Sequence, residues 1–105
     1  MRRTGLVISV SAAMWTASVS ADARSVYGGG DGSSVQKAVV INADNETSGV
    51  AAEWEWLRSH LSGWRVRRQV LMGKAGRKYD RFTVVSPDGK QKEIYFDISK
   101  YFGKH

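Results

Sequence analysis

The sequence predicts an α+β fold: a two-layer β-α-β-β-β roll, with one amphipathic helix packed on a mainly antiparallel sheet. Residues 45–63 are the one segment whose apolar side chains recur with the period of a helix. Four other segments have the composition or alternation of strands, and three of them follow the helix, separated by turn sequences. Such a sheet has one apolar face, and the helix is the element available to cover it.

The predicted helix has a single apolar stripe with the spacing i, i+4, i+7 and i+11. The stripe residues are Val50, Trp54, Leu57 and Leu61. Asn45, Thr47 and Ser48 can each supply an N-cap oxygen, and Gly63 suits the turn that leaves the helix. Trp56 lies about 120° from the stripe. We expect it either to pack under Tyr101 and Phe102 or to stand exposed as a binding anchor.

The predicted strands are residues 37–43, 64–72, 79–85 and 93–99. Their inward side chains are expected to be Ile41, Val66, Val70, Phe82, Val84, Ile94, Phe96 and Ile98. Arg68 interrupts the alternation of its strand and indicates a bulge or an edge. The opposite, solvent-facing side is expected to carry Arg65, Arg67, Gln69, Tyr79, Arg81, Thr83, Tyr95 and Asp97.

Residues 1–23 have the layout of a secretory signal peptide. Arg2 and Arg3 precede an uncharged apolar run over 6–15, and a small-residue site allows cleavage after Ala21 or Ala23. An uncleaved membrane anchor is the alternative, although the run is short for a membrane span. We therefore expect a periplasmic or secreted protein, with a flexible Gly/Ser-rich linker over 24–36 and one small domain over 37–105.

Several motifs resemble those of a family of small, exported, functionally uncharacterised proteins of Gram-negative bacteria. These motifs are DGSS followed by KAVVI, NETSGVAAEWEWL in the helix, the Tyr79-Asp80 pair that opens a strand, and YFDISKYFGK near the end. The resemblance covers nearly all of the predicted domain. It implies export and a shared architecture, and it implies no activity.

Basic charge is concentrated on the predicted sheet. Residues 24–62 carry 3 basic and 5 acidic side chains, a net charge of −2, whereas residues 63–105 carry 11 basic and 4 acidic ones, a net charge of +7. For an exported protein this favours an acidic envelope protein or an anionic envelope polymer as the partner, and nucleic acid is not expected. The alternative is a charged face that only keeps the protein soluble. The candidate partner-binding residues are Trp56, His60, Arg65, Arg67, Tyr79, Arg81 and Tyr95.

The sequence offers little for catalysis. The chain has no cysteine and two histidines, and its acidic residues are scattered, so we expect no cofactor and no metal site. We predict a non-enzymatic binding or accessory module of the cell envelope. The alternative is a small envelope hydrolase, or its regulator, centred on His60 with Ser59 or Ser62 and with Asp80 or Asp97. We expect those two aspartates instead to pair with Arg65, Arg67 or Arg81 across the sheet.

Overall fold

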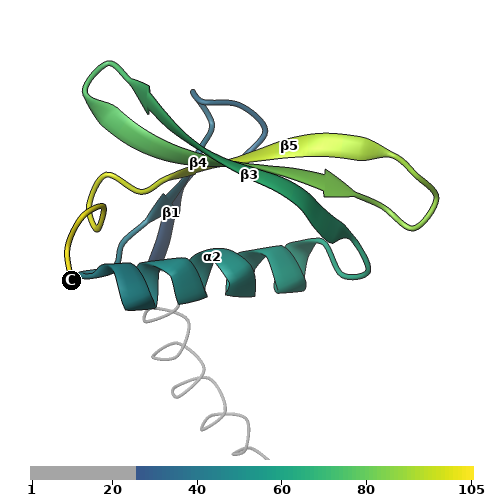
Figure 1. Cartoon of the computed structure of the whole chain (residues 1–105), viewed down its shortest axis with the longest axis horizontal. Coiled ribbons are helices and arrows are strands. Elements are labelled where there is room, and N and C mark those ends of the chain that lie inside the picture. Colours follow the sequence, from purple (N-terminus) through teal and green to yellow (C-terminus); the bar gives the residue numbers. More distant parts are fainter. Residues whose placement is uncertain (1–25) are drawn as a thin grey trace, which may run out of the picture.

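The computed structural model describes residues 26–105 and confirms the α+β class (Figure 1). Its elements are β1 (Tyr27–Gly29), β2 (Val39–Ile41), α2 (Glu46–His60), β3 (Arg65–Lys74), β4 (Arg77–Val85) and β5 (Gln91–Asp97). The predicted signal peptide, residues 1–23, lies outside the described residues. Within residues 26–105, no helix is long and apolar enough to cross a membrane.

One five-stranded sheet, in the order β1-β2-β5-β4-β3, lies over helix α2 (Figure 1). Strands β3, β4 and β5 form an antiparallel meander, and β1 pairs with β2 in the same antiparallel sense. The β2–β5 pair is parallel, which places β5 in the centre of the sheet and leaves β3 at an edge.

Residues 27–36 belong to the fold, so the prediction of a flexible linker over 24–36 is wrong from residue 27 onward. β1 pairs with β2 in the register Tyr27↔Ile41, and the amide of Gly30 donates a 3.0 Å hydrogen bond to the Ala38 carbonyl. A Cβ atom on Gly30 would lie only 2.5 Å from the carbonyl oxygen of Lys37. At Gly30, therefore, glycine allows a close approach of two backbones rather than disorder.

Helix α2 begins as predicted, because the Asn45 side chain caps it by accepting a 3.0 Å hydrogen bond from the Ser48 amide. Its buried face differs from the predicted stripe. The buried helix residues are Gly49, Glu53, Trp56 and Leu57, of which the stripe contained only Leu57. Val50 is 41% exposed, whereas Trp56 is 8% exposed. The helix is therefore rotated relative to the prediction.

The core lies between α2 and the sheet and is built around aromatic rings. Phe82 and Phe96 are fully buried on neighbouring strands, with ring centroids 5.5 Å apart. Trp56 packs edge-on against Phe96 at 5.4 Å, and Trp54 packs edge-on against Phe82 at the same distance. Trp56 is therefore a core residue, and the idea that it is an exposed anchor is wrong.

Arg68 was predicted to mark a bulge or an edge, and β3 has both: it is an edge strand, and its register shifts between Val66 and Arg68. The bulge changes which face the rest of β3 presents. Val66 pairs with Val84 and Arg68 with Thr83, so Arg67 is the extra residue. One extra residue in a strand moves every later side chain to the opposite face of the sheet. Val70, predicted to point inward, therefore lies on the outer face, as Met72 does. Their partners in the register are Arg81 and Tyr79. Gln69, predicted on the outer face, lies on the helix side instead, where its Nε2 donates to Asp80 Oδ2 at 3.4 Å.

Candidate binding surface

Four arginines gather on the outer face of the sheet, and we call them the arginine cluster. They are Arg65, Arg67, Arg68 and Arg81. Arg67, Arg68 and Arg81 line a shallow hollow that Thr83, Gln91 and Glu93 complete, whereas Arg65 lines a separate hollow between α2 and the start of β3. The bulge explains why Arg67 and Arg68, although adjacent, line the same hollow.

The arginine cluster has little neutralising charge of its own. Glu93 lies 3.6 Å from Arg81 (Oε1 to Nε) and also accepts a 2.8 Å hydrogen bond from Thr83 Oγ1. Arg67 donates a 2.9 Å hydrogen bond to the neutral Gln91 amide. In the described part of the chain, Arg65, Arg67 and Arg68 form no ion pair with a carboxylate. Three guanidinium groups are therefore free to bind an external anion.

At the far end of the same face, an arginine and an aspartate pair with each other. Arg77 Nε lies 2.7 Å from Asp97 Oδ2. Burial raises the pKa of Asp97, but hydrogen bonds from Arg77 and Ser99 outweigh that effect and hold the pKa below its ordinary value. Asp97 does pair with an arginine, although not with one of the three predicted. Tyr79, a predicted binding residue, is 7% exposed at this end and does not present a free surface.

The other predicted site residues lie nearer to the helix. Trp56 and His60 stack with ring centroids 4.1 Å apart, and both line a second hollow together with Tyr95 and the loop at residues 30–33. Tyr95 pairs with Arg81 in the register, so it borders the arginine cluster as well. The structure therefore brings Arg67 and Arg81 to one hollow, with Arg65 on the same face of β3 and Tyr95 beside Arg81. Trp56 and His60 line a different hollow, which they share with Tyr95.

His60 is held by its own helix. Its Nδ1 lies 3.0 Å from the Trp56 carbonyl oxygen and 3.1 Å from Ser59 Oγ. Ser59 Oγ itself donates a 3.1 Å hydrogen bond to the same carbonyl. No carboxylate hydrogen-bonds to His60 within residues 26–105, and the same residues contain no group of three side chains able to hold a metal ion. The hydrolase alternative centred on His60 stays a prediction.

A buried acidic group at the centre of the helix was not predicted from the sequence. Glu53 is fully buried beside Asp80 and Tyr101, and neither of its carboxyl oxygens has a hydrogen-bond partner among the described residues. Burial, reinforced by the neighbouring Asp80, raises the pKa of Glu53 to about 10. Burial also raises the pKa of Tyr101, and the charge of Glu53 adds to that effect. Glu53 is therefore a neutral acid at pH 7. The sequence feature that could have revealed this buried acid is an acidic residue that lies between Gly49 and Trp56 on one face of the helix.

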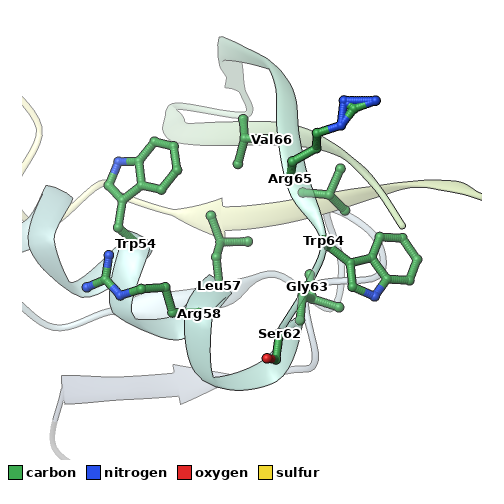
Figure 2. Close-up of a pocket in the computed structure, with 10 residues that line it drawn as sticks. Trp54, Leu57, Arg58, Ser62, Gly63, Trp64, Arg65 and Val66 are labelled. Carbon is green, nitrogen blue, oxygen red and sulfur yellow. The ribbon is translucent and has the colours of Figure 1, made fainter. Parts of the chain in front are cut away.

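Two apolar hollows lie along α2 and β3, and we call them together the α2–β3 groove. One part is lined by Trp54, Leu57, Leu61, Trp64, Val66 and Val84 (Figure 2). The other part, toward the start of the helix, is lined by Val50, Leu71, Ile98, Tyr101 and Phe102 together with Glu46 and Asp80. All four residues of the predicted helix stripe line this groove. They lie on one apolar side of the helix, and for this reason their spacing was interpreted as the buried face.

Comparison with known proteins finds no match to this chain among family models, curated proteins or solved structures. The arrangement of charge and apolar surface is therefore the basis for proposing a function.

Proposed function

We propose that this protein is an exported, non-enzymatic binding module of the cell envelope, which contacts an acidic protein or an anionic polymer through the outer face of its sheet. The observation that carries the proposal is the arginine cluster. Three of its guanidinium groups have no carboxylate partner in the described chain, although they lie side by side on one strand.

The chemistry of arginine suits this role. A guanidinium group presents its donors in a planar fork that matches the two oxygens of a carboxylate or phosphate. Over β3, β4 and β5 the outer face carries six cationic side chains and two carboxylates. The cations are Arg65, Arg67, Arg68, Lys74, Arg77 and Arg81, and the carboxylates are Glu93 and Asp97. An excess of one sign over one surface attracts and orients a partner of the opposite sign.

The export part of the proposal is supported by the sequence. The charged start, the short apolar run and the small-residue site of residues 1–23 are typical of a signal peptide. The resemblance to exported proteins of Gram-negative bacteria agrees with it and stays a prediction. Together they favour the envelope as the place where the arginine cluster meets its partner.

A charge-reversal experiment tests the proposal. The triple variant R65E/R67E/R68E is compared with the unchanged protein for retention of periplasmic and outer-membrane components. The variant K37E/K100E/K104E is the matched control, since it makes the same charge change at exposed lysines away from the arginine cluster. We expect the arginine variant to lose retention and the lysine variant to keep it. Equal retention by both variants would rule out the outer face as the binding surface.

A further inference from the structure

Strand β3 is a long edge with a free side. It is the outermost strand of the sheet, spans 10 residues, and pairs only with β4 within the described chain. The free side of an edge strand presents unpaired amide and carbonyl groups that another strand can bind. At the opposite edge, β1 has 3 residues, two of them glycine. The bulge at Arg67 leaves residues 68–74 as the regular part of the β3 edge.

On the helix side of this edge lies exposed apolar surface. Val50, Leu71 and Phe102 are 41%, 53% and 39% exposed, and they are the exposed large apolar side chains of residues 26–105. All three line the same part of the α2–β3 groove. Exposed apolar side chains that gather at one place, rather than scatter, mark an interaction site.

On the other side of this edge lies positive charge. Within the regular part of β3, Arg68 and Lys74 are on the outer face, at its two ends. Arg81 pairs with Val70 between them. A strand placed beside β3 would therefore have one row of side chains next to cations and the alternate row over the groove.

We propose that β3 accepts an extended segment of a partner protein as an additional strand, and that this segment alternates apolar and acidic side chains. The apolar side chains enter the α2–β3 groove beside Leu71, and the acidic ones lie next to Arg68 and Lys74. Main-chain hydrogen bonds to the edge supply affinity, and the alternate side chains supply specificity. This inference rests on the proposed function and deepens it, because it names a peptide strand as the ligand.

A second copy of this chain is not expected to pair with the β3 edge. Pairing two β3 strands would bring the cations of the two edges together, and like charges placed opposite each other on neighbouring strands are destabilising. The exposed side chains on this edge include Arg65, Arg67, Arg68 and Lys74. An acidic segment removes that repulsion and replaces it with ion pairs.

The test uses a synthetic decapeptide that alternates glutamate and valine, with binding to the purified protein followed by fluorescence anisotropy. A peptide of the same composition, with its glutamates and valines in separate blocks, is the control for charge alone. Two further versions carry N-methyl groups on every valine or on every glutamate. In a strand, alternate amides point to the same side, so strand addition requires that one methylated version loses binding and the other keeps it.

Two variants of the protein locate the contact. Leu71 and Met72 are neighbours on β3 but lie on opposite faces. We expect Leu71→Ser to weaken binding about tenfold, because an apolar contact in the groove is lost. Met72→Ser, the matched control, should change binding less than about twofold. Leu71 is 53% exposed, so its replacement should leave the fold intact, and thermal unfolding of both variants checks this.

The outcomes separate this inference from the proposed function. Strand addition is supported if the alternating peptide binds and the block peptide does not, if only one of the two methylated peptides binds, and if Leu71→Ser weakens binding. If the block peptide and both methylated peptides bind equally well, and R65E/R67E/R68E abolishes their binding, strand addition is overturned and the proposed function stands. Strand addition is likewise overturned if no peptide binds while envelope components are still retained through the arginine cluster. Self-association through β3, seen by sedimentation and lost in the Leu71 variant, would also overturn it.

Discussion

Replacing Glu53 by glutamine should make the protein more stable at neutral and alkaline pH. The carboxyl group has an ordinary pKa of 4.5 when unfolded, and burial raises its pKa to about 10 in the fold. Above pH 4.5 the unfolded chain therefore releases a proton that the folded chain keeps. A group whose pKa is raised by folding contributes stability below its unfolded pKa, and that contribution is lost as the pH rises toward the folded pKa.

The size of the effect follows from the two pKa values. Each pH unit between them costs about 1.4 kcal/mol in the free energy of unfolding. Between about pH 5 and pH 8 the loss from this one carboxyl group is about 4 kcal/mol, a large part of the stability of a small domain. Glutamine fills the same space and does not titrate, so Glu53→Gln should not show this loss.

The measurement is urea unfolding of both proteins at several pH values from about 5 to about 8. Because other groups titrate in both proteins, the informative quantity is the difference between the two free energies of unfolding. It should grow with pH in favour of the variant. Glu55→Gln is the control, since Glu55 is exposed on the same helix and pairs with Arg58 at 3.0 Å. It should shift stability by less than about 1 kcal/mol, as exposed ion pairs do.

A difference between Glu53→Gln and the unchanged protein that stays constant with pH would refute the reasoning. It would mean that the Glu53 carboxyl group is ionised in the fold, held by a partner other than Asp80 and Tyr101. Tyr101→Phe provides a second test of the same site. It removes a buried hydroxyl that has no hydrogen-bond partner among the described residues, so it should leave the pH dependence in place.

Three further substitutions test the packing. Gly49→Ala should destabilise the protein, although alanine favours helices, because the new Cβ would collide with the Tyr101 ring; thermal unfolding would measure this, and a stabilised variant would contradict the contact. Tyr27→Phe removes the 2.7 Å hydrogen bond from the Tyr27 hydroxyl to the Ala52 carbonyl and should cost about 1 kcal/mol in urea unfolding, whereas no change would argue against β1 being fixed to the helix. Gly76→Ala should cost about 1 kcal/mol for a different reason: nothing lies within 4 Å of the new Cβ, but the φ of +80° is unfavourable for alanine, so a neutral result in the same assay would contradict this turn geometry.

The sequence predicted five of the six elements, missed β1, and gave the wrong orientation for the helix and for the second half of β3. The helix start at Asn45 was identified because capping is a local interaction. The buried face of α2 was not, because it carries Glu53, and an acidic residue counts against burial unless its neutral form is considered. The neighbouring face, from Val50 to Leu61, was more apolar and gave the better helical pattern, although in the structure it lines a groove.

The outer face of the sheet shows a second limit of prediction from sequence, which concerns the face that each side chain occupies. Arg68 indicated a bulge or an edge, but alternation alone does not say whether a residue is inserted or which one. A shift of one residue moves every later side chain to the opposite face of the sheet. Val70 and Gln69 were therefore assigned to the wrong faces. Arg65, Arg67 and Arg81 were assigned correctly, since Arg65 precedes the bulge, Arg67 is the inserted residue, and Arg81 lies on a strand without one.

The position of β5 in the sheet determines when the fold can be completed. β5 is the last strand in the chain, yet it pairs with β4 on one side and with β2 on the other. The β3-β4-β5 meander needs only contacts close in sequence, whereas β2 must wait for residues 96 and 97. A chain that ends before β5 would therefore have no strand on which to dock β1 and β2, and its helix would lose most of the surface that it covers.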